Sequence, residues 1–363
     1  MKLERIQFVH FRNHESLIFE PDGGVNLIYG LNGSGKTSVL EGVHYCALTK
    51  GFVNAHDNEC LSSGKPFFLL KGVFADSYGK KTEVNVTYSP QEGKQLTVNG
   101  QSSSSFSSHV GSVPCITFSP ADIAIINGSP AERRRFLDNA ICQTDRGYLD
   151  ALLQYRRILQ QRNSLFLRSS GSGPDPEMMD ILADQMALPA ARVTARRVQF
   201  VREILPFLRQ YLGVVSGGEY PSIEYRSSFL PPGFAGSPDQ LAVHFRNRIG
   251  QKRHEEIARS QTSAGPHRDD VVFYLHEREI KKYASQGQKR SFLIALKLAL
   301  YRYFTVKSDE EPICLFDDLF SELDSQRIDS LLHLLVDSGQ IIITATEQRT
   351  APAVNTMSIQ GMA

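Results

Sequence analysis

The chain has 363 residues, and 40 Lys and Arg side chains stand against 39 Asp and Glu, so the formal net charge is +1. A balance this even creates no global field that would attract nucleic acid, and any DNA-binding surface therefore has to be local. With 41% hydrophobic and 22% charged residues, the composition is that of a globular protein with a large core. The length suggests two domains, or one large α/β unit with an insertion.

Neither a targeting segment nor a membrane span is visible in the sequence. Met1 leads directly into an alternating, strand-like segment, which is not the pattern of a signal peptide. No apolar run approaches the roughly 18 residues that cross a bilayer. The five cysteines contain no C-x-x-C pair, so we expect reduced thiols rather than a zinc site or disulfides. We therefore expect a cytoplasmic protein with no membrane partner.

The first hundred residues are dominated by strand patterns, either alternating or compactly apolar. We expect strands within 3–29 and 66–100, a helix over 36–48, and a solvated loop over the serine-rich run 101–108. Asn99-Gly100 is a hairpin turn signal, which fits a sheet built from neighbouring strands.

From residue 119 to about 260 the apolar spacing changes to a helical period, and we expect helices over 130–168 and 176–213. Pro189 and Pro206 predict helix starts or kinks there, because proline lacks the amide hydrogen that a helix interior needs. Strand and helix signals alternate again after residue 270. The strands expected there are 271–275, 313–316 and 340–344, and the helices are 287–305 and 328–336.

The strongest motif is Gly30-Leu31-Asn32-Gly33-Ser34-Gly35-Lys36-Thr37, which matches G-x-x-x-x-G-K-[ST] between an expected strand and an expected helix. Its glycines let backbone amides turn toward phosphate oxygens, and the helix N-terminus adds partial positive charge. Lys36 is expected to reach the β and γ phosphates of ATP, and Thr37 to hold Mg²⁺. A chance match in a glycine-rich turn would not explain the flanking elements. The expected nucleotide-binding residues are Gly30, Asn32, Gly33, Ser34, Gly35, Lys36, Thr37 and Ser38.

Two acidic residues follow the apolar strand 313–316. The carboxyl ends of parallel strands form the edge at which open sheets bind ligands. We expect Asp317 to bind the Mg²⁺ shell and Asp318 to orient or deprotonate the attacking water. The alternative for an isolated Asp-Asp pair is a solvated turn, but the P-loop motif favours the catalytic interpretation.

Almost the whole chain separates Lys36 from Asp317, whereas a GTPase-like fold keeps its two motifs close in sequence. The distance favours an α/β P-loop ATPase head of the ABC/SMC type, a mixed sheet with helices, interrupted by a mostly helical lobe. The predicted domains are 1–118 for the N-terminal half of the head, 119–262 for the helical insertion and 263–363 for the C-terminal half.

The segment Ala284–Arg290, which we name the signature-like segment, precedes the expected helix 287–305. Ser285 and Gly287 stand in register with the serine and second glycine of the ABC signature Leu-Ser-Gly-Gly-Gln. A hydroxyl, a glycine and a helix N-terminus suit a γ-phosphate. Such a loop lies too far around an ABC head to reach its own nucleotide, so we expect an ATP-dependent, head-to-tail homodimer. Ser285 would be catalytic in trans, with Gly287 and Gln288 at the nucleotide; the alternative is an ordinary helix N-cap at Ser285.

Three weaker signals complete the head. Leu319–Asp324 resembles the D-loop, which follows the dimer interface in ABC heads. Thr344 and Thr346 are the hydroxyls that could contact the γ-phosphate where transporter heads have a histidine. Ser119 or Asp122 stands where those heads have the glutamine of the Q-loop.

Six motifs in order resemble the RecF family of bacterial recombination-mediator ATPases, which are related to SMC heads. Four of them are Phe11–His14, Phe118–Asp122, the segment Gly128–Asp138 and Gly265–Asp270, and the signature-like segment and Phe316–Asp324 complete the set. The resemblance covers nearly the whole chain. It implies a slow, weak ATPase that DNA stimulates, and whose ATP-bound dimer binds single- and double-stranded DNA at gaps and junctions. The implied partners are RecR, RecO and RecA-type proteins.

The resemblance also places Arg12 and Asn13 near the nucleotide, with Arg12 contacting phosphate or ribose. From the sequence pattern alone, Arg12 could equally be a surface charge at a strand end.

The expected insertion is locally basic, since residues 131–260 carry 18 Arg and one Lys against 14 Asp and Glu. The planar fork of arginine suits phosphate, and such contacts would give salt-sensitive binding with little sequence preference. The alternative is solvated or ion-paired helix faces. The candidate DNA-binding residues are Arg133, Arg134, Arg135, Arg192, Arg196 and Arg197.

Two other functions are open to a P-loop head. An ATPase subunit of a membrane transporter predicts a Q-loop glutamine and a switch histidine, and neither is in place. An ATPase fused to a nuclease, as in the OLD class, needs a further metal-binding domain, for which the sequence after the head leaves no room. We therefore expect a protein of DNA repair.

Overall fold

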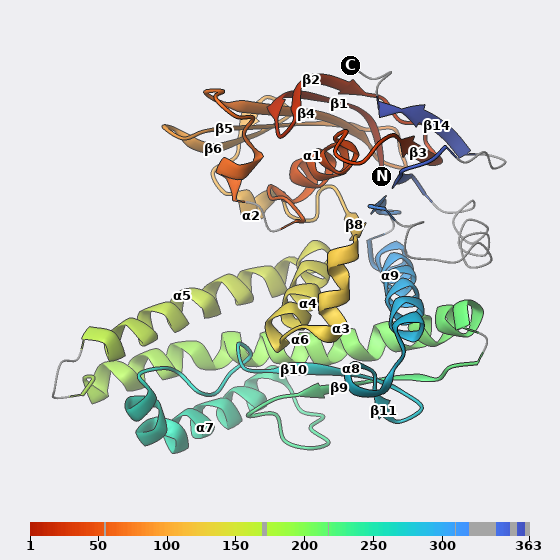
Figure 1. The fold of residues 1–363 in the computed structure, drawn as a ribbon. Coiled ribbons are helices and arrows are strands. Elements are labelled where there is room, and N and C mark those ends of the chain that lie inside the picture. The colour runs from red at the N-terminus through yellow and green to blue at the C-terminus, as the bar shows by residue number, and fades with distance from the viewer. Residues whose placement is uncertain are drawn as a thin grey trace. The chain divides into compact units, whose positions relative to one another are not determined.

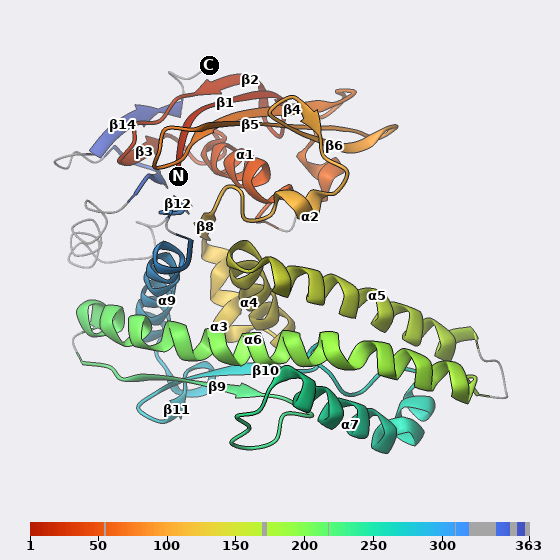
Figure 2. The ribbon, with the colours of Figure 1, turned by 180° about the vertical axis from the view of Figure 1, so that it is seen from behind.

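The structure is a computed structural model, and it describes residues 1–53, 56–168, 173–216, 218–308, 310–318, 339–348 and 354–359 (Figures 1 and 2). By internal packing the chain forms two compact units. The first comprises Met1–Ile123, Gln210–Gly218 and Gln286–Ala363, and the second Ala124–Arg209 and Glu219–Ser285. The functional domain boundaries expected after residues 118 and 262 stay a prediction.

The first unit contains a six-stranded sheet of order β2-β1-β4-β5-β6-β7, in which every neighbouring pair is antiparallel. One face is apolar, as Phe8, Leu70 and Val86 show: they lie side by side on three strands and are fully buried. The alternating pattern of the sequence thus fixes which face is covered. The strands are β1 (Lys2–Phe11), β2 (His14–Phe19), β4 (Phe68–Ala75), β5 (Lys81–Ser89), β6 (Gly93–Val98) and β7 (Gln101–Ser102).

The second sheet of this unit is parallel throughout and has the order β14-β3-β13-β12-β8. Its central strands are almost continuously buried and mostly apolar, as expected of strands covered on both faces. Because all five run the same way, the segments that follow β3, β8, β12 and β13 meet at one edge. The strands are β3 (Val25–Tyr29), β8 (Cys115–Phe118), β12 (Ile313–Phe316), β13 (Ile341–Ala345) and β14 (Val354–Ser358).

Helix α1 (Lys36–Leu48) packs against strands of both sheets, and nearly all its side chains are buried. A helix covered on all sides needs few polar positions, which explains its weakly amphipathic sequence. Helix α9 (Gln286–Ser308) contacts β8 on the parallel sheet. Short helices α2 (Phe106–His109), η1 (Asp57–Cys60) and η2 (Pro120–Ile123) complete the unit.

The second unit consists of helices and a three-stranded antiparallel sheet of order β11-β10-β9. Its core joins α5, α6 and α7 through buried residues such as Tyr155, Met186 and Phe245. The helices are α3 (Ala124–Asn127), α4 (Pro130–Thr144), α5 (Arg146–Arg168), α6 (Pro176–Ser216), α7 (Pro238–Arg259) and α8 (Ile280–Tyr283); the end of α6, from Gln210, belongs to the first unit. The strands are β9 (Pro221–Arg226), β10 (Asp270–Leu275) and β11 (Arg278–Glu279).

Several sequence-based elements need correction. Pro189 and Pro206 start no helix, because α6 continues through both. The expected helix 130–168 is two helices, since Asp145 has an extended backbone and its carboxylate accepts the amide hydrogen of Tyr148 at 2.9 Å. The run 101–108, expected to be a loop, contains β7 and most of α2. The expected helix 328–336 lies outside the described residues.

Candidate nucleotide site

The P-loop between β3 and α1 depends on glycine at Gly33 and Gly35, whose φ angles are 80° and 99°. Residues other than glycine rarely adopt this left-handed backbone conformation. At Gly35 a Cβ atom would also lie 2.6 Å from both Asn13 Nδ2 and the His14 ring. The β1–β2 turn therefore presses directly against the loop.

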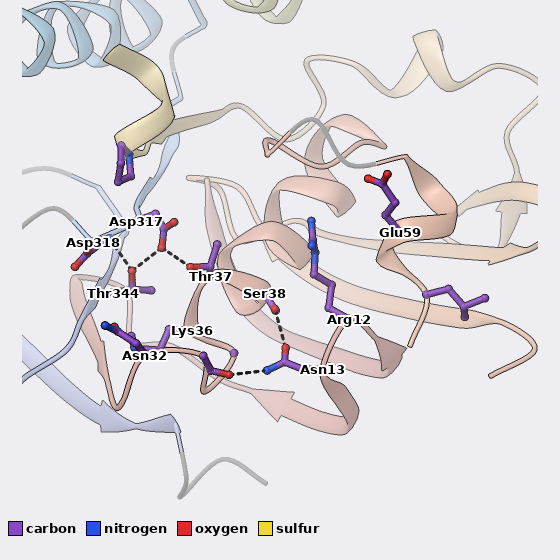
Figure 3. A pocket seen from close by; sticks show the side chains of 14 residues that line it. Arg12, Asn13, Asn32, Lys36, Thr37, Ser38, Glu59, Asp317, Asp318 and Thr344 are labelled. Atoms are coloured by element: carbon purple, nitrogen blue, oxygen red, sulfur yellow. Dashed lines mark hydrogen bonds between the residues drawn. The ribbon is translucent and has the colours of Figure 1, made fainter. Parts of the chain in front are cut away.

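Hydrogen bonds fix that turn to the loop. Asn13 Oδ1 accepts from Ser38 Oγ at 2.8 Å, and Asn13 Nδ2 donates to the Gly33 carbonyl at 3.4 Å (Figure 3). His14 Nε2 donates to the Gly35 carbonyl at 3.1 Å. Burial lowers the pKa of His14, which keeps the ring neutral beside the loop. Asn13 thus stabilises the P-loop through hydrogen bonds from the β1–β2 turn.

Arg12 is not a freely solvated strand-end charge. Its side chain is 27% exposed and forms an ion pair with Glu41 of α1, which is buried. Its backbone is left-handed, with φ 54°, and its amide donates to the Cys60 carbonyl at 2.7 Å. Arg12 lines the same pocket as the P-loop, and its contact with phosphate or ribose stays a prediction.

Lys36 is nearly buried and lies over the loop. Its Nζ donates to the carbonyls of Gly30 at 2.7 Å and Leu31 at 2.8 Å. Burial lowers the pKa of Lys36, while the carboxylates of Asp318 and Asp317 act in the opposite direction. The ammonium is therefore held at the loop before any phosphate is present.

The acidic pair after β12 lies at the same edge. Thr37 Oγ1 and Thr344 Oγ1 each donate to Asp317 Oδ1 at 2.8 Å, and the Asp318 amide donates to Thr344 Oγ1 at 2.9 Å (Figure 3). Burial raises the pKa of Asp317, although the two hydroxyl bonds oppose this change. The carboxylate therefore stands where an added cation would be favourable.

These side chains surround a pocket of about 610 Å³ in the first unit. It brings together most of the predicted residues: Arg12, Asn13, Asn32, Gly33, Gly35, Lys36, Thr37, Ser38, Asp317 and Asp318. Glu59, Leu61, Pro120 and Thr344 line it as well. No motif in the sequence marks Glu59 and Leu61, because they reach the pocket through the η1 segment.

Other predicted residues lie elsewhere. Gly30 and Ser34 belong to the P-loop but are not among the lining residues, and neither are Gly287 and Gln288 at the start of α9. Ser285 belongs to the second unit and directly precedes α9. The D-loop-like segment Leu319–Asp324 lies outside the described residues.

Asp122, one of the two Q-loop candidates, has both carboxylate oxygens hydrogen-bonded within the protein. Its carboxylate accepts from Lys297 Nζ at 2.9 Å and from the Ser119 amide at 2.7 Å. Pro120, which lies between Ser119 and Asp122 in the sequence, is the residue of this segment that lines the pocket.

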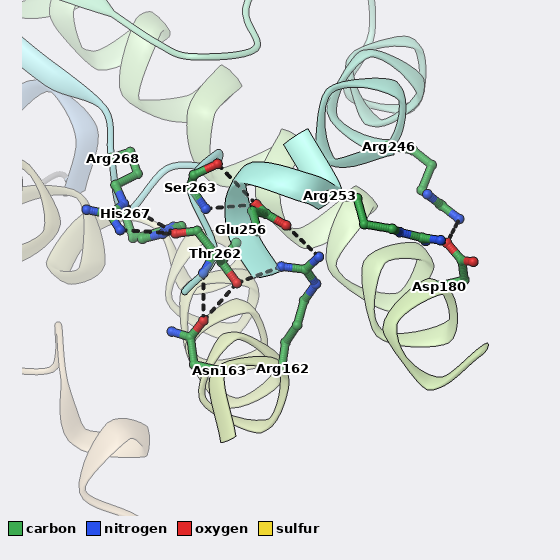
Figure 4. Close-up of polar contacts among 10 residues, drawn as sticks. All are labelled: Arg162, Asn163, Asp180, Arg246, Arg253, Glu256, Thr262, Ser263, His267 and Arg268. Carbon is green, nitrogen blue, oxygen red and sulfur yellow. Dashed lines mark hydrogen bonds and ion pairs between the residues drawn. The ribbon is translucent and has the colours of Figure 1, made fainter. Parts of the chain in front are cut away.

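In the second unit, the motif Gly265–Asp270 joins a polar network through His267 and Arg268, which both donate to the Thr262 carbonyl (Figure 4). Burial lowers the pKa of His267 to about 4, so the ring is neutral: Nδ1 accepts from Tyr155 at 2.5 Å and Nε2 donates to the Thr262 carbonyl at 3.1 Å. At its centre the Arg162–Glu256 ion pair, 2.7 Å long, is completely buried between α5 and α7.

Residues of the same motif accept hydrogen bonds from several of the candidate DNA-binding arginines. Arg133 forms a bidentate ion pair with the Asp270 carboxylate at 2.7 and 3.0 Å, and Arg134 donates to the Asp269 carbonyl at 2.7 Å. Arg197 is 2% exposed and donates to the Pro266 carbonyl, 2.7 Å away.

The other candidate arginines differ in whether they are ion-paired and covered or exposed. Arg197 also bonds the Asp138 carboxylate at 2.7 Å, and Arg196 bonds Asp145 at 2.7 Å. Arg192 is exposed, whereas Arg196, four residues further along α6, is largely covered. Arg135 is 48% exposed. We keep the DNA prediction for Arg135 and Arg192.

Within the part of the chain that the structure describes, no helix is long and apolar enough to cross a bilayer.

The fold and site define a P-loop ATPase head of the ABC/SMC class. Residues 2–361 match the family described as RecF/RecN/SMC N terminal domain. A crystal structure of an Smc head bound to the winged-helix domain of ScpA shares this fold, with a TM-score of 0.55 at 12% identity over 96% of this chain and 90% of that one. The predicted fold class is confirmed.

Within that class the chain belongs to the RecF family. It is 56% identical over 359 residues to the DNA replication and repair protein RecF of Chlorobium limicola, covering 99% of both chains. The RecF of Chlorobium phaeovibrioides is 51% identical, covering 97% of this chain and 95% of that one. The solved structure of the recombination mediator protein RecF-ATPrS in the RecFOR pathway has a TM-score of 0.91 at 28% identity, covering 98% and 95%. The transporter alternative finds no support.

We expect Asp317→Asn to raise the thermal unfolding midpoint of the ligand-free protein at pH 7.5. The folded pKa of Asp317 lies above its unfolded value, so its ionisation opposes folding above that pKa. Asparagine keeps an oxygen for both hydroxyls and removes the charge. Scanning calorimetry at pH 7.5 and pH 5 should show the advantage shrinking as the pH falls. Asp150→Asn, at a carboxylate 60% exposed, serves as the control, and a lower midpoint for Asp317→Asn at pH 7.5 would contradict the prediction.

We expect Arg162→Met to destabilise the second unit by about 3–5 kcal/mol, because it leaves Glu256 buried without its cation. Adding Glu256→Gln should restore much of the loss, since the amide oxygen can still accept from the Ser263 backbone, as Glu256 does at 2.8 Å. Calorimetric unfolding of the wild type, the single variants and the double variant closes the cycle. Additive losses in the double variant would show that the pair is not coupled.

Proposed function

We propose that this chain is an ATP-dependent DNA-binding protein of recombinational repair and replication restart. ATP would join two copies head to tail, the closed dimer would bind DNA at gaps and junctions, and slow, DNA-stimulated hydrolysis would release it. One observation carries the nucleotide part: Thr37 and Asp317, from opposite ends of the chain, are hydrogen-bonded at 2.8 Å in a pocket that Lys36 also lines.

ATP and Mg²⁺ suit the side chains of this pocket. A hydroxyl and a carboxylate are the oxygen ligands that Mg²⁺ uses beside nucleotide phosphates. Thr37 Oγ1 and Asp317 would hold the ion, which would withdraw negative charge from the β and γ phosphates. Lys36 Nζ would exchange the carbonyls of Gly30 and Leu31 for phosphate oxygens. Relatives solved as RecF-ATP support the choice of nucleotide.

Asp318 and Ser285 are the proposed catalytic side chains. Asp318 lines the pocket and would orient the attacking water. Ser285 directly precedes α9, so its hydroxyl and the first amides of a 23-residue helix could meet a γ-phosphate together. We propose that Ser285, Gly287 and Gln288 serve the nucleotide of a second copy.

DNA is the proposed macromolecular ligand, and RecO, RecR and RecA-type proteins are the proposed partners. The names of the relatives place them in DNA replication and repair, and a solved relative is assigned to the RecFOR pathway. Arg135 and Arg192 offer exposed guanidinium groups for phosphate contacts.

Mixing two inactive variants tests whether each nucleotide site is formed by residues from two copies of the chain. Lys36→Ala and Ser285→Arg should each abolish ATP turnover alone, because each homodimer then lacks one half of both sites. Mixing them forms dimers in which one site combines an intact P-loop with an intact Ser285. Equal mixing should restore about a quarter of the wild-type rate per protomer. A mixture that stays inactive, or Ser285→Arg that turns over normally by itself, would contradict the head-to-tail arrangement.

A DNA titration tests the rest of the proposal. With ATP, the wild type should bind gapped duplex more tightly than plain duplex, and the affinity should fall steeply between two salt concentrations. Arg192→Ala should reduce the slope of log affinity against log salt by about one for each phosphate that the protein no longer neutralises. Arg5→Ala, at an arginine of the first unit that is 49% exposed, is the matched control. Equal affinity with and without ATP would exclude the switch.

A further inference from the structure

Thr344 occupies a special place in the parallel sheet. It lies near the end of β13, which pairs with the P-loop strand β3 on one side and with the strand of the acidic pair, β12, on the other. Its side chain is 1% exposed. The sheet order therefore places this one hydroxyl between the two motifs of the nucleotide site.

The hydroxyl makes two bonds whose directions are fixed by chemistry. A carboxylate only accepts, so Thr344 Oγ1 donates its hydrogen to Asp317 Oδ1 at 2.8 Å. A backbone amide only donates, so the same oxygen accepts from the Asp318 amide at 2.9 Å. Serine can make both bonds, whereas valine, which has the same shape, can make neither.

The residue fixed by the second bond has an uncommon backbone. Asp318 has φ 49°, a left-handed conformation that residues other than glycine seldom adopt. Such conformations persist where the surroundings determine them, and they gather at functional sites. The bond from the Asp318 amide to Thr344 is one such restraint.

The first bond orients the neighbouring carboxylate. Both hydroxyl donors, Thr37 and Thr344, use Oδ1 of Asp317. Among the described residues none donates to Oδ2, so the two bonds together leave that oxygen available at the pocket. If Thr37 turned toward a ligand, Thr344 would still hold the carboxylate.

We propose that Thr344 is a positioning residue for ATP hydrolysis, which aligns the Asp317 carboxylate and the Asp318 backbone through a single hydroxyl. The inference rests on the proposed ATPase function. It differs from the expectation that Thr344 contacts the γ-phosphate, because here the hydroxyl already donates its single hydrogen to Asp317 and has none left for a phosphate oxygen. Its effect passes through the two acidic residues.

The alternative is that Thr344 has only a packing role near the end of a strand, where β-branched residues are common. Thr344→Val keeps that shape and removes the hydroxyl, while Thr344→Ser keeps the hydroxyl and removes the methyl group. Thr356→Val, on β14 of the same sheet and outside the pocket, is the matched control.

Two readouts decide between them. Hydrogen exchange of the ligand-free protein should be faster at the Asp318 amide in Thr344→Val, and close to wild type in Thr344→Ser and Thr356→Val. In steady-state ATP hydrolysis, Thr344→Val should lower kcat about tenfold or more, with a much smaller change in KM, because misplacement of catalytic groups acts mainly on the chemical step. The half-saturating Mg²⁺ concentration should rise in the same variant, and Thr344→Ser should rescue both.

Two outcomes would overturn the inference alone. One is wild-type exchange and wild-type kcat in Thr344→Val. The other is a Thr344→Ser protein as impaired as Thr344→Val, with exchange accelerated throughout β13, which would show a packing role. A wild-type protein that hydrolyses no ATP would instead overturn the proposed function, and the hydrolytic role of Thr344 with it.

Discussion

The carboxylate of Asp317 is the point on which the nucleotide site depends. It accepts hydroxyl hydrogens from Thr37 on α1 and Thr344 on β13, and so joins this helix and this strand to the end of β12. Burying a carboxylate is unfavourable unless hydrogen bonds or a cation compensate for the lost water. Here two hydroxyls compensate in part, and the raised pKa of Asp317 shows that the compensation is incomplete. The remaining deficit is what a bound cation would remove.

The parallel sheet makes this arrangement possible. Its five strands all run one way, so the carboxyl ends of β3, β8, β12 and β13 lie at one edge. Helix α1 begins at that edge and is buried against both sheets, which fixes the P-loop relative to the acidic pair. The insertion between the two halves can therefore be large, because the sheet and not the sequence distance sets the geometry.

Sequence reasoning found the parts of the site that are local in sequence. The P-loop, the strand Ile313–Phe316 and the acidic pair each carry their signal within a few residues, and the structure brings them together in one pocket. Features that depend on distant partners were beyond its reach. Arg133 reads as a phosphate-binding arginine until Asp270 is seen beside it.

The other misses have the same kind of cause. Strand β9 is short and half exposed, so it has no apolar run that would reveal it. The prolines inside α6 carry the usual signal for a helix boundary, but the packing of α6 in its core overrides it. Glu59 enters the pocket only because η1 folds against its rim.

The close approach at Gly35 has a consequence for how this site can vary among relatives. A methyl group there would meet Asn13 and His14 at 2.6 Å, so positions 13, 14 and 35 cannot drift separately. We therefore expect the three positions to vary together, because their contact joins a turn of the antiparallel sheet to the P-loop. A substitution in that turn would then disturb the P-loop backbone at Gly35, and a compensating change would be found on either side of this contact, in the turn or in the loop.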